Sequence, residues 1–412
     1  MEHLHLSHTT PDGWQKDSVG HLIVEQPKSP IKVSDAACFG SYPFFTSGDD
    51  VLMHTVALVE GDNIYLATGG QANIKHYYGD ASYSTDTYVV KSTEEIDTTL
   101  LYYYLTNIRS FIDSNYFQGS GLKHLQKKDF KKHELCFPKD IEEQKRIAAL
   151  LTQIDSVIAD TKKLIDKYRD IKIGLMQDLL TKGIDENGNI RSEETHEFKD
   201  SELGRIPVEW ECTTMDKLFD LVSGITPSRS NTSYFNENGT NWVKTLDLNE
   251  DYLFNTEEKL SDLALKETSI RLHPSNTLLL AMYGGWIQIG RTSIIKNPAT
   301  TNQAIVAFYP KGNPIVPIEY VQFFLQVYKH KWKKCAISTR KDPNISKKDV
   351  LEFSFIYPLN FKEAEVIVDH ITKNHDFLKI EEEHLVKLKN QREGLLKDLL
   401  SGHIQVPSTI KL

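Results

Sequence analysis

The chain has 412 residues, of which 40% are hydrophobic and 25% charged, with a formal net charge of −9. This composition is ordinary for a soluble globular protein of two or three domains, and the acidic balance argues against indiscriminate nucleic-acid binding while leaving local basic patches open. The apolar runs are too short to span a bilayer and the first ten residues lack the features of a secretory signal, so we expect a cytoplasmic protein without a membrane partner. Four widely spaced cysteines with no CxxC pair argue against a disulfide framework or a zinc site.

Residues 1–140 are predicted to form a first globular domain made of strands and loops. Its apolar pieces are short and are separated by Gly, Pro and Asn, as strands usually are; they lie at Tyr42–Thr46, Val51–Val59 and Asn63–Thr68. Residues 100–108, LLYYYLTNI, predict a buried helix. Residues 119–133 then contain five lysines and one acidic residue, which makes this segment a local basic patch.

Residues 141–184 predict one long helix. Apolar residues recur there at steps built from three and four, which places one stripe on a helix face; they are Ile147, Leu151, Ile154, Ile158, Ile165, Tyr168, Leu175 and Leu179. This heptad pattern is typical of a coiled-coil seam, so the helix needs a partner helix. About 40 residues would make a rod of roughly 60 Å, and Gly183 supplies the stop signal.

The partner helix is predicted in the same chain, at residues 361–405. The two helices match at one constant offset, which takes Leu175 to Leu395. The polar breaks in the stripe match at this offset as well; they pair Thr161 with Glu381 and Lys172 with Arg392. A polar residue at a seam position fixes the register of a coiled coil, so the shared breaks indicate a duplication more strongly than shared leucines do.

The duplication extends to the globular parts. Residues 185–204 are predicted to be an exposed acidic linker, residues 205–360 a second globular domain, and residues 406–412 a tail. The equivalent motifs are Lys127-Lys128-Asp129 with Lys347-Lys348-Asp349, at the same offset, and Gly69-Gly70 with Gly284-Gly285. A tandem copy of one unit can fold with a pseudo-two-fold axis. We therefore expect an α+β protein whose two globular domains are held apart by two long helices packed as an antiparallel coiled coil.

The sequence lacks the common motifs of catalysis. It has no GxxxxGK[ST] loop, no HExxH and no GxGxxG, which carry phosphate, zinc and dinucleotide chemistry. The Asn/Asp-Pro-Pro-aromatic tetrapeptide of adenine amino-methyltransferases is also missing. We therefore expect a binding protein without catalytic or metal-ligating residues and without a cofactor of its own.

Each globular segment ends in a basic loop that suits DNA. Residues 329–348 contain eight basic residues and one acidic residue, and Lys and Arg neutralise phosphates while hydroxyl and amide groups bond phosphates or base edges. A solvated surface loop is the alternative reading, but the presence of two equivalent loops in an acidic protein favours DNA. The candidates are Lys123, Lys127, Lys128, Lys131 and Lys132 in the first loop and Ser338, Thr339, Arg340, Lys341, Asn344, Lys347 and Lys348 in the second.

Two glycine turns supply further candidates for DNA contact. Glycine allows the backbone to approach a ligand closely, and aromatic or amide side chains nearby offer wedging or base readout. A simple hairpin turn remains an open alternative for both. The candidates are Gly69, Gly70 and Asn73 in the first half and Trp286, Gln288 and Arg291 in the second.

The order of these motifs resembles the specificity subunit of type I restriction–modification enzymes. The resemblance runs from end to end and rests on the segments SELGRIPVEW, GGWIQIG, TTNQAIVAFYP, STRKDPNISKKDV, EEQKRIAALL and GLMQDLLTKGI. The first half departs from the second in places, because HLQKKDF stands where Asn-Ile-Ser occurs later and the LG-x-IP opening is absent.

The resemblance implies a non-catalytic subunit. Each recognition domain would read one half of a split, asymmetric site in the major groove of double-stranded DNA, with the coiled coil as a ruler. The helices would bind two modification subunits, which carry S-adenosylmethionine, and one or two restriction subunits, which use ATP and Mg, could join. Outward-facing helix residues are the partner-binding candidates, namely Gln144, Arg146, Lys162, Arg169, Lys379, Lys387 and Gln391.

A different class of function has the same architecture. A non-catalytic adaptor would bind protein partners through its two globular domains, while the coiled coil sets their spacing. Such an adaptor predicts no sequence-specific DNA binding, so strong salt dependence of DNA binding would discriminate between the two.

Overall fold

The computed structural model describes residues 10–36, 39–332, 336 and 344–407. The chain divides into two units, of which the first comprises residues 1–164 and 381–412 and the second residues 165–380. Each unit combines antiparallel strands, short helices and a stretch of both long helices, in agreement with the predicted α+β class.

The main sheet of the first unit has four antiparallel strands in the order β2-β8-β5-β6. These strands are β2 (Ile23–Glu25), β8 (Thr87–Ser92), β5 (Asp62–Ala67) and β6 (Ile74–Tyr78). Helix α2 (Thr98–Asn107) packs against this sheet and buries Leu100, Leu101 and Leu105 completely. The buried helix predicted at residues 100–108 is therefore confirmed.

The remaining strands of the first unit form small sheets beside the main one. β3 (Tyr42–Phe45) lies between β4 (Val51–His54) and β7 (Ser82–Tyr83), β1 (Trp14–Ser18) pairs with β11 (Glu134–Pro138), and β9 (Phe117–Gln118) pairs with β10 (His124–Leu125). The short helices are α1 (Val19–Leu22), η1 (Val33–Asp35), α3 (Arg109–Tyr116) and α4 (Lys127–Phe130). The strand predicted at residues 51–59 ends at His54, and Val59 forms only an isolated bridge with Ala81.

The second unit repeats this topology. Its main sheet has the order β15-β22-β19-β20-β17, in which the first four strands are antiparallel like β2-β8-β5-β6 and β17 joins in parallel. The strands are β15 (Phe219–Ser223), β22 (Ile305–Pro310), β19 (Leu278–Ala281), β20 (Thr292–Ile295) and β17 (Tyr252–Leu253). Helix α8 (Ile318–Val327) packs on β20, and both its ends correspond to those of α2 at the offset that relates the two long helices.

The smaller sheets recur as well. β16 (Phe235–Val243) lies between β18 (Lys259–Leu260) and β21 (Ala299–Thr301), and its parallel pairing with β21 repeats the pairing of β3 with β7. β14 (Trp210–Thr214) pairs with β23 (Ser354–Pro358), and β12 (Phe198–Ser201) pairs with β13 (Gly204–Pro207). The short helices are α6 (Met215–Leu218), η2 (Thr232–Tyr234), η3 (Thr245–Asp247), α7 (Asp262–Glu267), η4 (Tyr328–Lys331) and α10 (Lys347–Leu351).

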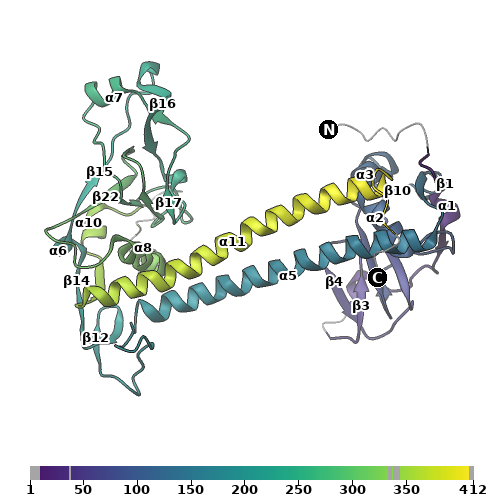
Figure 1. Cartoon of the computed structure of the whole chain (residues 1–412), viewed down its shortest axis with the longest axis horizontal. Coiled ribbons are helices and arrows are strands. Elements are labelled where there is room, and N and C mark those ends of the chain that lie inside the picture. The colour runs from purple at the N-terminus through teal and green to yellow at the C-terminus, as the bar shows by residue number, and fades with distance from the viewer. Residues whose placement is uncertain (1–9, 37–38, 333–335, 337–343, 408–412) are drawn as a thin grey trace. The chain divides into compact units, whose positions relative to one another are not determined.

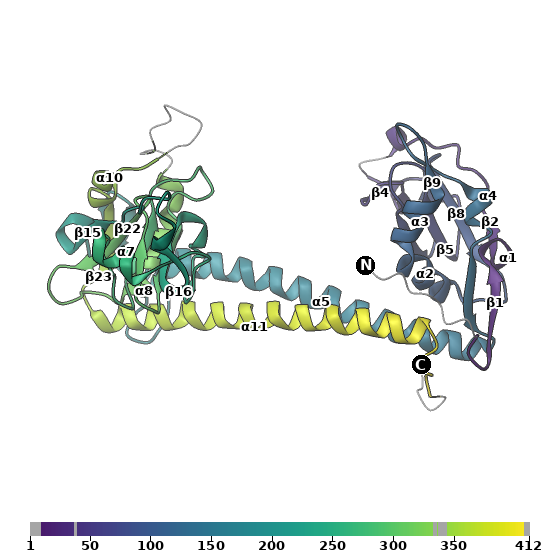
Figure 2. The ribbon, with the colours of Figure 1, turned by 90° about the horizontal axis from the view of Figure 1, so that it is seen from above.

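The long helices are α5 (Ile141–Leu179) and α11 (Phe361–Leu400), and Figures 1 and 2 both show them side by side. In the first unit, Ile147 and Leu151 near the start of α5 share a core with Leu396 and Leu399 near the end of α11. In the second unit, the core joins the end of α5 to the start of α11. The packing is therefore antiparallel, as predicted. Helix α5 ends before the predicted 184, because the chain turns at residues 180–182 and Gly183 takes a φ of +64°.

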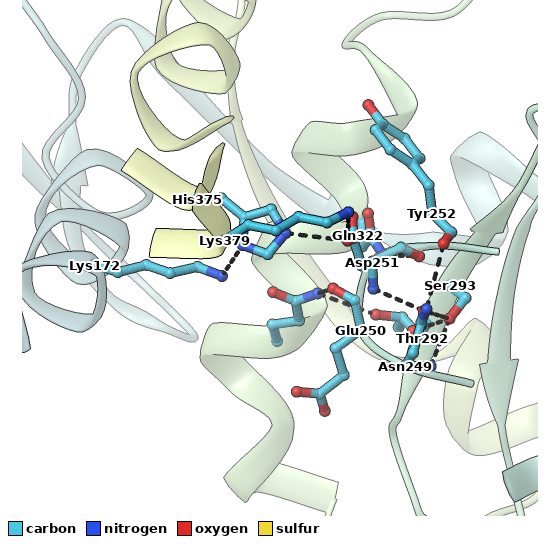
Figure 3. A network of polar contacts seen from close by, with 11 residues as sticks. Lys172, Asn249, Glu250, Asp251, Tyr252, Thr292, Ser293, Gln322, His375 and Lys379 are labelled. Carbon is cyan, nitrogen blue, oxygen red and sulfur yellow. Dashed lines mark hydrogen bonds and ion pairs between the residues drawn. The ribbon is translucent and has the colours of Figure 1, made fainter. Parts of the chain in front are cut away.

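One of the two matched polar breaks in the helices, Lys172 with Arg392, has a structural explanation. In the first unit Arg392 of α11 bonds the Asp155 carboxylate of α5, which also accepts a hydrogen bond of 3.0 Å from the Tyr103 hydroxyl. In the second unit Lys172 Nζ donates to His375 Nδ1 at 3.0 Å (Figure 3). Lys172 and His375 are the repeat equivalents of Arg392 and Asp155, so each unit places one polar pair across its helices.

The segment predicted as an exposed linker contains a buried contact. Most of its acidic residues are exposed, but Arg191 is buried and its guanidinium holds Glu363 of α11 at 2.5 and 3.1 Å. The same carboxylate accepts hydrogen bonds from Trp210 Nε1 and from the backbone N–H of Ile184, each at 3.1 Å. Arg191 therefore anchors this part of the segment to the second unit, and residues 198–201 of the same segment form strand β12.

Candidate nucleic-acid interface

The structure brings the first glycine turn and the first basic loop together. Gly69 forms an isolated bridge with His124, the Gly70 N–H donates to the Lys123 carbonyl at 2.9 Å, and the Leu125 N–H donates to the Thr68 carbonyl at 3.0 Å. Gly70 has a φ of +85°, a conformation that favours glycine. The two candidates found separately in the sequence are therefore one surface, which we call the first turn–loop pair (residues 68–73 and 119–133).

The second unit makes the same arrangement. Tyr283 forms an isolated bridge with Asn344, and the Ile345 N–H donates to the Met282 carbonyl at 3.0 Å. Gly284 and Gly285 both have positive φ, at +121° and +86°. We call this surface the second turn–loop pair (residues 283–291 and 344–348).

The lysines of the first turn–loop pair differ in how far they are engaged. The Lys131 ammonium bonds Glu25 and lowers the pKa of that carboxyl, and Lys132 pairs with Asp129 at 2.8 Å. Lys127 lies 3.9 Å from the centre of the Tyr88 ring, and partial burial lowers the pKa of its ammonium. Lys123 and Lys128 are exposed, and no ion pair is formed by either within the described residues. These two are the lysines best placed to meet a phosphate.

The lysines of the second turn–loop pair begin a short helix. Ser346 caps α10 in a capping box with Asp349, so Lys347 and Lys348 stand exposed in its first turn. Lys127 and Lys128 occupy the same place in α4. The expected contacts Ser338, Thr339, Arg340 and Lys341 lie outside the described residues, while Asn344 is described and joins the turn through its backbone.

The candidates on the second glycine turn have different surroundings. Trp286 is 49% exposed and Ile287 69%, so an apolar tip projects from the turn. The Gln288 side chain packs back over the glycines, because a Cβ on Gly284 would lie 3.0 Å from Gln288 Cβ. Arg291 is half-buried, and its carbonyl accepts from the Ala281 N–H.

The Asn73 side chain is engaged within the first unit. Its Nδ2 donates to the carbonyls of Gly48 and Ser47, at 2.8 and 3.3 Å. Lys75 reinforces the same loop through the carbonyls of Thr46, Gly48 and Asp50. The Asn73 amide therefore helps to hold the loop at residues 46–50, and its contact with DNA stays a prediction.

A polar network fixes the segment before β17 in the second unit (Figure 3). Asp251 lies 3.2 Å from His375 Nε2 and 3.7 Å from Lys379 Nζ, and the hydrogen bond from His375 lowers the pKa of Asp251 to about 2. The Glu250 carbonyl accepts from Gln326 Nε2 at 2.8 Å, and its carboxylate pairs with Lys329 at 2.6 Å. Because Glu250 has a φ of +64°, an unfavourable value for a residue with a Cβ, these contacts are what hold it.

Two of the partner-binding candidates face inward. Gln144 is fully buried; its Oε1 accepts from the Asp97 N–H at 2.7 Å, and its Nε2 donates to the carbonyls of Glu95 and Pro138. The Arg146 side chain is only 14% exposed and lies 3.7 Å from Asp140. Both expectations are wrong, because the first turns of α5 are covered by the first globular domain.

The other partner-binding candidates lie on exposed helix faces. Lys162, Arg169, Lys379, Lys387 and Gln391 are exposed, although Arg169 contacts Asp166 and Lys379 approaches Asp251. These candidates are all polar and leave out an exposed apolar series on α5. Val157, Leu164 and Ile171 follow one another at heptad spacing on α5 and are 41%, 37% and 41% exposed. That spacing is a second heptad register, and it is visible in the sequence.

Two structural features are absent from the described residues, namely a cluster of metal-type ligands and a membrane-spanning helix. Among these residues, no group of three or more His, Cys, Asp or Glu side chains could hold a metal ion. In the same part of the chain, none of the helices combines the length and apolarity needed to cross a membrane.

By its fold, the chain is a tandem repeat of one α+β unit with a basic loop set against a glycine turn in each copy. The family described as the type I restriction modification DNA specificity domain matches residues 11–167 and 207–390. The chain therefore belongs to this family, the specificity subunits of type I restriction–modification systems.

Individual relatives agree with this assignment. The chain is 26% identical over 424 residues to the type I restriction enzyme MjaVIII specificity subunit of Methanocaldococcus jannaschii, with 96% of this chain and 94% of that protein covered. The crystal structure of a type I restriction-modification system S subunit from M. genitalium is similar with a TM-score of 0.67, at 16% identity, over 96% of this chain and 98% of that one. A chain from a study of complex assembly and conformational transition of the type I R-M system has a TM-score of 0.55, at 13% identity, over 97% of this chain and 100% of that one. These structural similarities concern the fold.

Proposed function

We propose that each unit recognises one half of a split DNA sequence through its turn–loop pair. The observation that carries this proposal is that two features far apart in the sequence are joined by an isolated backbone bridge in both units, Gly69 with His124 in the first and Tyr283, next to the glycine pair, with Asn344 in the second. If each glycine turn were a simple hairpin turn without a ligand, there would be no reason for a basic loop to lie beside it in both units. The recurrence of exposed lysines at the same place supports a shared polyanionic ligand.

The chemistry of the turn–loop pair suits double-stranded DNA. Exposed lysines at the start of α4 and α10 would neutralise phosphates and set the position of the protein, while the glycine turn would bring side chains to base edges. Sequence choice would then reside in residues that differ between the units, such as Trp286 in the second turn and Gln71 at the corresponding place in the first. Two different sets of side chains would yield an asymmetric bipartite site.

We propose that α5 and α11 bind two modification subunits. The exposed heptad at Val157, Leu164 and Ile171 supports this proposal, because an apolar stripe on a helix already paired along its other face suits a further helix. In this arrangement the modification subunits carry S-adenosylmethionine and perform the methylation, and restriction subunits that use ATP and Mg can join. The chain itself takes part without a cofactor or catalytic residues, in the cytoplasm.

Co-expression with the cognate modification subunit tests the proposal. Single-molecule sequencing of the host DNA should reveal methylated adenines in a split motif with a fixed spacer. Exchange of residues 205–358 for the equivalent segment of another specificity subunit should change one half of the motif and leave the other half unchanged. A stable complex that methylates no motif would contradict the proposal and would favour the adaptor, whose globular domains bind proteins.

A further inference from the structure

The second glycine turn and the second basic loop are connected at two places. At one of them, Tyr283 forms an isolated bridge with Asn344. At the other, the Glu250 N–H donates to the carbonyl of Thr292, the residue after the turn, at 2.9 Å, and the Glu250 carboxylate accepts from Lys329 Nζ at 2.6 Å. Lys329 is the first residue of the basic loop. We call this second connection, which joins the end of the turn to the start of the loop, the Glu250 junction.

Glu250 makes this junction in an unfavourable backbone conformation. Its φ of +64° lies in the left-handed region, which glycine adopts freely but a residue with a Cβ does not. The Glu250 carbonyl is held in place by Gln326 Nε2 at 2.8 Å. Strained residues of this kind persist where their surroundings hold them, and they cluster at functional sites. The carboxylate that bonds Lys329 is the group that an unstrained glycine would lack.

The next residue anchors the junction to the long helices (Figure 3). The Asp251 carboxylate lies 3.2 Å from His375 Nε2 and 3.7 Å from Lys379 Nζ, both on α11. On its other side His375 accepts from Lys172 Nζ of α5 at 3.0 Å. The segment that contains Glu250 is therefore fixed to the helices on one side and to the second turn–loop pair on the other.

The first unit makes an equivalent connection with different residues. Arg109, the counterpart of Lys329 at the offset that relates the two long helices, donates from Nε to the Ala72 carbonyl at 2.5 Å. Asp113 accepts from the Ala72 N–H at 2.7 Å. In the first unit the helix therefore bonds the glycine turn directly, whereas in the second unit Glu250 stands between the two. Both units thus fix the turn at a second place besides the isolated bridge.

We propose that Glu250 is a positioning residue for recognition of the second half-site. By holding both Lys329 and the end of the glycine turn, it fixes the distance between the basic loop and the turn. Phosphate contacts from the loop and base contacts from the turn then occur in one register on the DNA. This inference rests on the proposed DNA recognition. The Glu250 carboxylate acts through Lys329 and not on the DNA itself.

The test measures methylation by the assembled modification complex on duplexes with single base-pair substitutions. Methylation mapping defines the motif, and the exchange of residues 205–358 identifies the half-site that the second unit reads. A substitution in a recognised half-site typically weakens binding about 5- to 150-fold. In Glu250→Gly this penalty, measured as the ratio of kcat/KM for intact and substituted DNA, should shrink at least about threefold for the second half-site and stay unchanged for the first. For intact DNA, KM should rise and kcat should stay unchanged, because the methylating groups lie on the modification subunit.

Two matched variants separate positioning from stability. Among the described residues other than glycine, only Glu250 and Asn276 have positive φ, and Asn276 Oδ1 also accepts from a lysine, Lys296, at 3.0 Å. Asn276→Gly should therefore keep the penalties of both half-sites. Glu250→Lys combined with Lys329→Glu should recover most of the discrimination that either single change removes, because the ion pair forms again with its charges exchanged. Thermal unfolding of Glu250→Gly should stay close to that of the unchanged chain, because glycine adopts this φ freely and a half-exposed ion pair contributes little.

The outcomes are distinguishable. An unchanged penalty for the second half-site in Glu250→Gly would overturn the inference and leave the proposed function standing. Equal losses at both half-sites with a lower unfolding temperature would show a general structural role, and this result would overturn the inference as well. If the unchanged complex methylated no specific sequence, the proposed function and this inference would fail together.

Discussion

Replacement of Gly183 by alanine should destabilise the second unit far more than the same change at Gly188. Both glycines have positive φ, +64° and +82°, so both substitutions strain the backbone. A Cβ at Gly188 meets nothing within 4 Å, whereas one at Gly183 would lie 2.3 Å from Glu363 Oε1 and 2.6 Å from both Arg191 Nη1 and Trp210 Cζ2. The pair therefore separates backbone strain from disruption of the buried ion pair.

The expected magnitudes follow from these two contributions. A left-handed conformation costs a residue with a Cβ roughly 1–2 kcal/mol, partly offset by the lower entropy of the unfolded chain, so Gly188→Ala should cost about 1 kcal/mol. Gly183→Ala adds the separation of Arg191 from Glu363, both at most 9% exposed. Breaking a buried pair costs about 3–5 kcal/mol, so the two variants should differ by about that amount.

Hydrogen exchange of the full chain provides the measurement. The free energy of opening should fall in peptides that cover β14 and the start of α11, because Trp210 and Glu363 both bond within the network. Glu363→Gln should produce a similar local loss. Equal losses for Gly183→Ala and Gly188→Ala, to within about 1 kcal/mol, would refute the reasoning.

Three further predictions concern pH, DNA and partners. Burial lowers the pKa of His273 from 6.5 to about 4, so between these pH values the unfolded chain binds a proton that the folded chain does not bind. As the pH falls through this window, the free energy of unfolding of the second unit should therefore fall by about 1.4 kcal/mol per pH unit. His273→Gln should flatten the pH profile of thermal unfolding. Lys347→Glu combined with Lys348→Glu should weaken DNA binding at least tenfold at physiological salt and reduce the salt dependence of binding, measured by fluorescence anisotropy. The assembly of the subunits should persist. Full DNA affinity would contradict the assignment of the basic loop. Val157→Asp should weaken binding of the modification subunit about tenfold or more in calorimetry, because it removes apolar burial of about 1.5 kcal/mol and places a charge in the interface. The thermal unfolding of the chain alone should not change. Unchanged affinity would exclude the face of α5 that carries Val157 from the interface.

The sequence by itself determined the duplication and the elements of which it consists. The constant offset that aligns the leucines of the two long helices also aligns α2 with α8 and β11 with β23. Local periodicity sufficed for this, because a helix with one apolar stripe repeats in the sequence as it repeats in space. The matched breaks at Lys172 and Arg392 were visible for the same reason.

Only the tertiary structure decided which face of each element is covered and which distant residues meet. Gln144 looks like an outward polar residue of a coiled coil, yet three backbone groups of the first unit satisfy its amide. Arg191 lies in an acidic stretch, yet it is buried against Glu363, 172 residues away. Burial depends on contacts between segments far apart in the chain, which no window of sequence contains. The same reason hid the junction at Glu250, which arises only where the end of a glycine turn and the start of a basic loop approach each other.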